Sequence, residues 1–264
     1  MIHTFFIPHN PLMISKIGKE YSQNVSISIQ ALKKIRQIIY NLNPDKIFII
    51  TPPQEAVQSI SINQSEEYAV NFKEFGDLSI QFNILGDLDI STRLRDFLLV
   101  NNFDIRLFSN PKVSYKAFVP LYYLNKYHID SRGFEKKMVH DTNIKNEFII
   151  IRCSDGDFDY HLKFGELLNN FLVQENQEIV LIACGDLIEN FNEVNKDEAI
   201  KIADDVLQDM QNDYQALLNY KLEKFNSPFL KIFPTIFPLI SKLKPKVFSI
   251  DKKFKGVYLS CSFE

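Results

Sequence analysis

A histidine between two prolines is the first residue of this chain whose type and position could do chemistry. His9 follows the short apolar run of residues 5–7 and lies between Pro8 and Pro11. Proline lacks a backbone N–H and fixes its own φ, so these two prolines end sheet pairing and stiffen the loop. His9 is therefore expected at the carboxyl end of a strand, where open α/β sheets place their ligand crevices. A loop histidine satisfied by a backbone carbonyl is the alternative, and a lone histidine leaves both interpretations open.

Two acidic residues occupy a comparable place further along the chain. Asp186 and Glu189 follow Gly185, which comes directly after the apolar run of residues 179–184. Glycine at a strand end permits a tight turn or a close backbone approach. Imidazole and carboxylate groups are the ligands of non-haem Fe(II) sites, which use two histidines and one carboxylate. The alternative to a metal-ligand role is that Asp186 caps a turn and that Glu189 is solvated.

The elements that would position these groups read as an α/β fold. The apolar, β-branched run of residues 46–50 is typical of a central strand buried on both faces. Apolar residues at helical spacing precede it from Val25 to Leu42, with Ser22 as the expected N-cap and Pro44 as the stop. The same strand–helix–strand pattern returns over residues 147–184. We therefore predict one domain over residues 1–264, three-layered, with a central mixed, largely parallel sheet flanked by helices.

The other segments are assigned more coarsely. Residues 54–77 are polar and weakly patterned, and their segment at residues 63–67 is expected to form a surface excursion. Residues 125–146 are expected to form a loop or a connection between the two halves. The period-two pattern of residues 78–84 predicts a half-exposed or edge strand. Residues 229–243 predict a buried helix kinked by Pro234 and Pro238. Periodicity also predicts further helices and strands over residues 89–100, 104–107, 119–124, 199–210, 217–222, 246–250 and 256–263.

Composition excludes several classes of protein. A hydrophobic fraction of 45% and a charged fraction of 24% are those of an ordinary globular chain. The net charge of −3 gives no reason to expect nucleic acid or an anionic membrane as a partner. The three cysteines lie far apart in apolar runs, which favours buried packing over disulfides or zinc. Without a secretory signal pattern or a convincing membrane span, a cytoplasmic location is the default expectation.

Several short motifs occur along the chain in a recognisable order. They are Pro8-His9-x-Pro11-Leu12, Ile17-Gly18, Pro44-Asp45-x-Ile47, Thr51-Pro52, Val119-Pro120-Leu121-Tyr122, His161-x-x-x-Gly165, Gly185-Asp186-Leu187 and Phe254-x-Gly256-Val257. In this order they resemble the LigB-like superfamily of class III extradiol ring-cleavage dioxygenases, which includes the Memo-like proteins. The resemblance implies an α/β domain holding a non-haem Fe(II) that binds a catecholic substrate and O₂.

The residues that would carry this chemistry depart from the family pattern. His9 falls on the first metal-ligand histidine, but Pro53 stands where the second would follow Thr51-Pro52. Ser114-Tyr115-Lys116 replaces the usual Asp-His-Gly, and Ile188-Glu189 replaces a Ser-His that supplies an acid/base histidine. The glutamate ligand expected near the late apolar helix has no counterpart in residues 226–229.

These departures favour one hypothesis and leave a second open. The first is a protein whose iron site has degenerated and which acts as a binding or scaffold protein, with a small aromatic molecule or a protein as its partner. The second is a divergent metal-dependent oxidoreductase of the dioxygenase type. It would use Fe(II) or another divalent metal at a site rebuilt around His9, with Glu189, Tyr115 and Asp186 in acid/base roles. The sequence predicts neither the substrate nor the oligomeric state.

Overall fold

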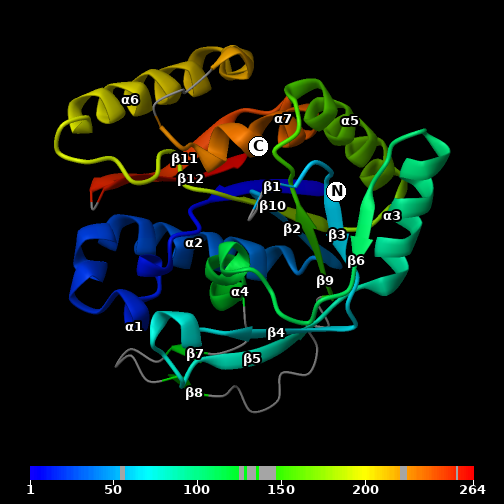
Figure 1. Ribbon diagram of the computed structural model, residues 1–264, viewed down its shortest axis with the longest axis horizontal. Helices are drawn as coiled ribbons and strands as arrows, with labels where there is room; N and C mark the ends of the chain where they lie inside the picture. The colour runs from blue at the N-terminus through cyan, green and yellow to red at the C-terminus, as the bar shows by residue number, and fades with distance from the viewer. Residues whose placement is uncertain (54–56, 125–127, 130–134, 137–146, 221–224, 254) are drawn as a thin grey trace.

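An eight-stranded sheet forms the centre of the molecule in the computed structural model (Figure 1). The structure describes residues 1–53, 57–124, 128–129, 135–136, 147–220, 225–253 and 255–264. The strand order is β11-β12-β1-β10-β2-β9-β3-β6. Its four middle strands are parallel: β1 (Ile2–Ile7), β10 (Ile179–Cys184), β2 (Lys46–Thr51) and β9 (Glu147–Arg152). β12 (Gly256–Phe263) and β3 (Ser61–Asn63) flank them in the antiparallel direction, next to β11 (Pro245–Lys253) and β6 (Arg106–Phe108). The predicted mixed, largely parallel α/β fold is confirmed.

The parallel strands end level with one another. Ile7 lies opposite Cys184, and Thr51 lies opposite Arg152. Successive side chains of a strand point to opposite faces of its sheet. Ile49 accordingly packs in one core and Ile50 in the other, which explains why the central positions of these strands are apolar in succession rather than alternating with polar residues. The loops after the four strands therefore emerge side by side at one carboxyl edge.

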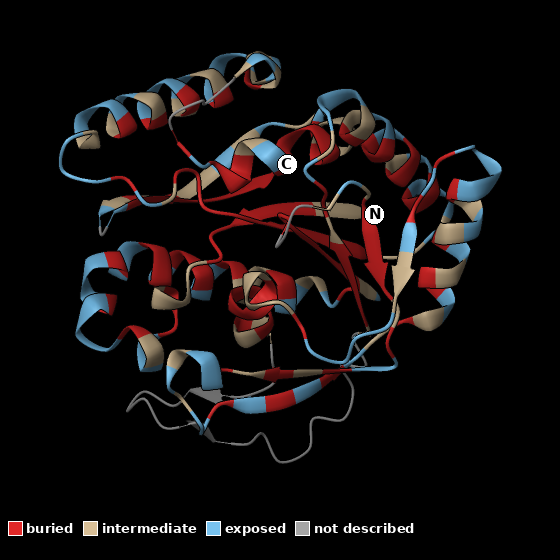
Figure 2. Cartoon of the chain, viewed as in Figure 1, coloured by how far each residue is buried: buried red, intermediate tan, exposed pale blue. Residues whose placement is uncertain are grey.

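Helices cover both faces of the sheet, with their buried sides turned toward it (Figure 2). One face carries α2 (Ser26–Leu42) and α4 (Phe118–Leu124). A separate two-stranded sheet of β4 (Glu67–Asn71) and β5 (Gln81–Leu85) packs into the same core. The other face carries α3 (Leu88–Val100), α5 (Phe158–Gln174), α6 (Lys196–Asn212) and α7 (Pro228–Ile240). The three layers expected from the sequence are thus present.

Short elements complete the described chain. They are η1 (Pro11–Met13), α1 (Ser15–Gly18), η2 (Lys19–Val25), η3 (Lys73–Phe75), η4 (Tyr115–Ala117), η5 (Tyr214–Asn219), β7 (His128–Ile129) and β8 (Glu135–Lys136), where η denotes a 3-10 helix. The rest of the connection expected over residues 125–146 lies outside the described residues, as do residues 221–222 of one expected helix. All three cysteines are buried and free, as their apolar surroundings predict. No helix among the described residues has both the length and the apolar character needed to cross a membrane.

The predicted start of the first long helix was wrong. α2 begins at Ser26, and Ser22 lies inside the preceding 3-10 helix, where its Oγ donates a hydrogen bond to the Leu12 carbonyl over 3.3 Å. A distant carboxylate caps α2 instead. Asp251 on β11 accepts hydrogen bonds from the Ser28 backbone N–H at 2.8 Å and the Ser28 hydroxyl at 2.7 Å. A cap supplied by another element leaves no signal in the local sequence.

The region of residues 54–77 contains two strands that were not predicted, and Asn63 and Ser65 of the surface excursion predicted at residues 63–67 are buried. Within it, β3 is a buried member of the main sheet between β9 and β6, and β4 pairs with β5. Polar residues conceal β3 in the sequence, because Ser61 and Asn63 are buried yet hydrogen-bonded, Asn63 donating to the Asn110 carbonyl at 2.8 Å. The strand expected at residues 78–84 therefore exists as β5, but it belongs to the small sheet.

Candidate functional site

His9 lies directly beyond β1, at the carboxyl edge of the sheet. Its side chain is only 3% exposed. The chain turns immediately after it, because the Asn10 side chain accepts a hydrogen bond from the Leu12 N–H at 3.0 Å and Pro11 opens η1. The imidazole is thereby held between the sheet edge and the loops that follow neighbouring strands.

Gly185 brings the second loop close to His9. Its N–H donates to the Ile7 carbonyl at 2.9 Å, which ties the ends of β10 and β1 together. A Cβ atom at this position would lie 3.0 Å from the Pro228 side chain and 3.1 Å from the Phe229 nitrogen. Glycine therefore allows the start of α7 to approach the sheet edge where the acidic residues follow.

The two acidic residues of this loop converge on His9. The Nε2 atom of His9 lies 2.9 Å from Glu189 Oε1, and its Nδ1 atom lies 3.7 Å from Asp186 Oδ1. The His9 backbone N–H also donates to Asp186 Oδ1 at 3.1 Å. One potential ligand atom from each of the three side chains lies within 4.8 Å of the others. Asp186 thus caps the His9 turn, as the alternative interpretation held, but it does so inside a buried cluster, and Glu189 faces the imidazole.

The pKa values of the two carboxyl groups are shifted in opposite directions. Complete burial raises the pKa of Asp186 to about 6, and the neighbouring charge of Glu189 adds to this, while His9 opposes it. Burial also acts to raise the pKa of Glu189, but the hydrogen bond and charge of His9, together with Lys116, hold it below its usual range. The Asn226 side-chain amide donates a further hydrogen bond to Glu189. Glu189 is therefore the stable anion of the pair, and Asp186 is the proton-holding group near pH 6.

Tyr115 lies beside this cluster on η4. Its ring centroid is 6.3 Å from that of His9 and 6.0 Å from that of Phe75. Burial, then the charges of Glu189 and Asp186, raise the pKa of the half-buried Tyr115 phenol. The phenol therefore stays protonated at neutral pH and is suited to donate a hydrogen bond.

Lys116 is a site residue that was not among the candidates from the sequence. Its Nζ atom donates a hydrogen bond to the Pro53 carbonyl at 2.5 Å. Burial lowers the pKa of Lys116, and the charge of Glu189 opposes this while that of Lys231 adds to it. The only sequence signal was its place in Ser114-Tyr115-Lys116, which departs from the family pattern.

The donor groups do not fit the two-histidine, one-carboxylate set that holds Fe(II) in the family. Proline has no side-chain ligand atom, and the backbone carbonyl of Pro53 already accepts a hydrogen bond from the Lys116 amine. At the start of α7, Ser227 Oγ donates to the Leu187 carbonyl at 2.6 Å, and Asn226 donates to Glu189. The described part of the chain therefore offers His9 with two carboxylates, and no second imidazole beside them.

His161 does not supply that second imidazole. Its ring is buried between Thr235 Oγ1, 2.9 Å from Nδ1, and the Ser154 carbonyl, 3.0 Å from Nε2. Burial lowers the pKa of His161, so the neutral ring is favoured. His161 lies on α5, and its two hydrogen bonds link this helix to α7 and to the loop after β9.

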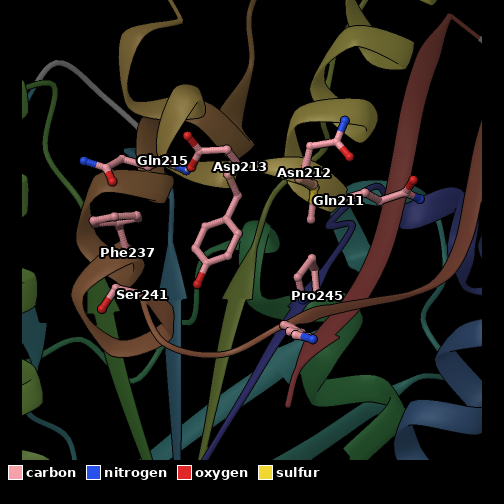
Figure 3. Close-up of a pocket in the computed structure, with 10 residues that line it drawn as sticks. Gln211, Asn212, Asp213, Gln215, Phe237, Ser241 and Pro245 are labelled. Carbon is pink, nitrogen blue, oxygen red and sulfur yellow. The ribbon is translucent and has the colours of Figure 1, made fainter.

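A pocket of about 380 Å³ lies elsewhere, between the end of α6, η5, the end of α7 and the start of β11 (Figure 3). Tyr214 forms part of its wall and is held by the Ile240 carbonyl at 2.5 Å and the Leu243 carbonyl at 2.8 Å. None of the site residues expected from the sequence lines it. The strand-end cluster therefore remains the candidate site.

Comparisons with known proteins agree with this architecture. A family model described as the catalytic LigB subunit of aromatic ring-opening dioxygenase matches residues 3–233. A solved structure titled "Crystal structure of uncharacterized protein JW3007 from Escherichia coli K12" is similar, with a TM-score of 0.61 and 11% sequence identity over 100% of both chains. At this identity the likeness shows the fold alone. No curated protein matches the chain in sequence.

Proposed function

Because this chain belongs to the LigB family of catalytic subunits of aromatic ring-opening dioxygenases, we propose that it binds a small aromatic molecule at the family's strand-end site without holding the family's iron. The observation that carries the proposal is the contact between Pro53 and Lys116. Where the family pattern has a histidine ligand, this chain has Pro53, and the Pro53 carbonyl accepts a 2.5 Å hydrogen bond from the Lys116 amine. With Pro53 in place of the second histidine and no counterpart of the glutamate in residues 226–229, two of the three protein ligands of that iron site are missing.

The remaining groups are suited to orient a polar aromatic ligand. Tyr115 and Phe75 present aromatic rings beside the cluster, and Tyr115 has a protonated hydroxyl to donate. Glu189 is 17% exposed and can accept a hydrogen bond from a ligand hydroxyl. Few precisely placed polar groups among apolar rings are typical of small-molecule sites. A protein partner that covers the same edge is the other occupant that the test must distinguish.

A divalent metal held by a different ligand set is the second candidate function. The 2.9 Å separation of His9 Nε2 and Glu189 Oε1 also suits two ligands that share one metal, since bonds of roughly 2.0–2.2 Å at right angles place ligand atoms about 3 Å apart. Asp186 near the other ring nitrogen resembles the carboxylate–histidine–metal arrangement. This set would support the divergent metal-dependent oxidoreductase.

Metal analysis and a ring-cleavage assay on the same preparation separate these functions. We expect the protein, incubated anaerobically with Fe(II) and then desalted, to retain less than stoichiometric metal and to leave substituted catechols intact under air. His9→Ala should not change that residual metal content. Stoichiometric iron with catechol cleavage would contradict the proposal. Stoichiometric zinc or manganese lost in both His9→Ala and Glu189→Gln would support the second candidate.

Ligand binding needs a measurement that does not depend on turnover. We expect phenolic compounds to change the NMR signals of residues at the carboxyl edge, and Glu189→Gln to weaken that binding by about tenfold, the effect of losing roughly 1.4 kcal/mol. Thr235→Val, a substitution on the α7 side of the sheet, should leave the affinity unchanged. Binding that persists in Glu189→Gln would show that the ligand lies elsewhere.

A further inference from the structure

Lys116 combines features that make an amine reactive. The side chain is half-buried, and a hydrogen bond of 2.5 Å to the Pro53 carbonyl fixes the position of its Nζ atom beyond the end of β2. Burial lowers its pKa, and the positive charge of Lys231 on α7 acts in the same direction. Partial desolvation and a second nearby cation favour the neutral, nucleophilic form of a lysine.

The surroundings of Lys116 supply the other groups that imine chemistry needs. Tyr115, its neighbour on η4, carries a protonated phenol. Glu189 is anionic, interacts with the charge of Lys116 and is hydrogen-bonded to His9. A proton donor, a proton-accepting pair and an amine therefore lie around one edge of the sheet.

We propose that Lys116 forms an imine with a small aromatic aldehyde or ketone bound beside the His9–Glu189 pair. This activity rests on the ligand-binding function proposed above and names the reactive class of its ligand as a carbonyl compound.

The chemistry balances without any oxidant, reductant or metal. The neutral Lys116 amine adds to the carbonyl carbon, forming a C–N bond, while the carbonyl π electrons move to oxygen, which takes a proton from the Tyr115 phenol. The nitrogen then loses a proton to the His9–Glu189 pair. The C–O bond breaks, and the oxygen leaves as water with the proton that the His9–Glu189 pair held. The proton that the Lys116 ammonium gave up to become the neutral amine restores the Tyr115 phenol. The product is a protonated imine and one water molecule.

The structure also suits the product of this reaction. The nitrogen of a protonated imine keeps one N–H, which can donate to the Pro53 carbonyl that the amine now contacts. Its positive charge remains near Glu189 and Asp186, both of which interact with the charge of Lys116. The site would therefore hold the same net charge before and after imine formation.

Reductive trapping tests the proposal on the full chain. The protein is incubated at pH 7 with limiting 4-hydroxybenzaldehyde and sodium cyanoborohydride, and modified lysines are mapped by peptide mass spectrometry. We expect Lys116 to be labelled faster than Lys231, because a lowered pKa increases the fraction of the amine that is neutral at pH 7. Lys116→Arg, which keeps a cation and a hydrogen-bond donor, should remove the fast phase, whereas Lys231→Arg should retain it.

Either of two results would overturn the inference: Lys116 labelled no faster than Lys231, or a fast phase that survives in Lys116→Arg. Circular dichroism of each variant checks that it folds, and Lys116→Met gives a second amine-free variant should the arginine disturb the site. Metal analysis of the same preparation separates the two proposals. Unlabelled Lys116 in iron-free protein contradicts only the imine, whereas stoichiometric iron and catechol cleavage contradict the proposed function itself.

Discussion

Replacing Asp186 by asparagine should change how the stability of the protein depends on pH. Asp186 is completely buried, and that burial raises its pKa to about 6 from an ordinary value of 3.8. Asparagine keeps the shape and an oxygen that can accept the His9 N–H, but it does not ionise. The difference in unfolding free energy between Asp186→Asn and the natural protein therefore isolates the titration of this one carboxyl group.

The sign and size of that difference follow from linkage. Below pH 4 the carboxyl is largely protonated in both the folded and unfolded chains, so its ionisation costs the fold little. Between pH 4 and 6 the unfolded chain ionises while the folded chain keeps its proton, and stability falls as pH rises. Above pH 6 both states are ionised and the full cost remains. Because one unit of pKa corresponds to 1.36 kcal/mol, that cost is roughly 3 kcal/mol at pH 7.

Urea unfolding followed by circular dichroism from pH 4 to 8 measures this effect. We expect the stability of Asp186→Asn relative to the natural protein to rise by roughly 3 kcal/mol between pH 4 and 7, then to stay level. Glu189→Gln is the matched control. Its carboxylate has a lowered pKa, so it stabilises the fold at neutral pH and loses that contribution in acid. The relative stability of Glu189→Gln should therefore fall as pH rises from 4 to about 5, where the unfolded carboxyl finishes ionising, and stay level above that.

Opposite slopes in the two difference curves are the critical result. The curves share the same unfolded chain and the same other titrating groups, which cancel in each difference. A flat curve for Asp186→Asn would mean that the buried carboxyl titrates normally. Slopes of the same sign would refute the assignment of Glu189 as the stable anion of the cluster.

The remaining predictions concern the packing that holds the site. Gly165→Ala would place a Cβ 2.2 Å from the Thr235 carbonyl oxygen where α5 crosses α7, so we expect a loss of at least about 1–3 kcal/mol, seen as a lower thermal midpoint. Gly76→Ala has no atom within 4 Å of its Cβ but a φ of +77°, so a loss of about 1 kcal/mol is expected; an equal effect at both glycines would contradict the packing argument. Thr235→Val removes the hydroxyl that pairs with His161 Nδ1 and should cost about 1–3 kcal/mol in urea unfolding, whereas an unchanged midpoint would mean that the contact contributes nothing.

The parts of the fold that could be predicted from the sequence are those with a local signal. The parallel strands contain uninterrupted apolar runs because both their faces are buried, and β10 begins and ends where its apolar run does. β3 could not be found this way, since only three residues form it and Ser61 and Asn63 satisfy their polar groups inside the sheet. The start of α2 depends on Asp251, which is 223 residues away from Ser28.

The same distinction applies to the candidate site. His9, Asp186 and Glu189 each follow an apolar strand, and parallel strands bring their carboxyl ends to one edge, so their proximity follows from the pattern. Lys116 follows no strand. Its relation to Pro53 joins residues 63 positions apart and depends on how η4 lies against the end of β2. The position of a short 3-10 helix such as η4 depends on tertiary packing, which sequence periodicity does not predict.

The charges of the site give Lys116 an electrostatic role beside the His9, Asp186 and Glu189 cluster. Asp186 and Glu189 place two carboxylates beside one imidazole, and buried carboxylates without compensation are costly. Lys116 stabilises the ionised form of Glu189, yet the pKa of Asp186 still lies near 6. The positive charges at this edge of the sheet therefore do not fully compensate the two carboxylates.

Any bound cation should therefore displace a proton from Asp186 at about pH 5–6, whereas neutral phenols should not. A protonated imine at Lys116 replaces one cation by another, so its formation should release no such proton. Proton uptake or release on binding, measured by calorimetry in two buffers, thus distinguishes a metal from a phenol and from an imine at the same site.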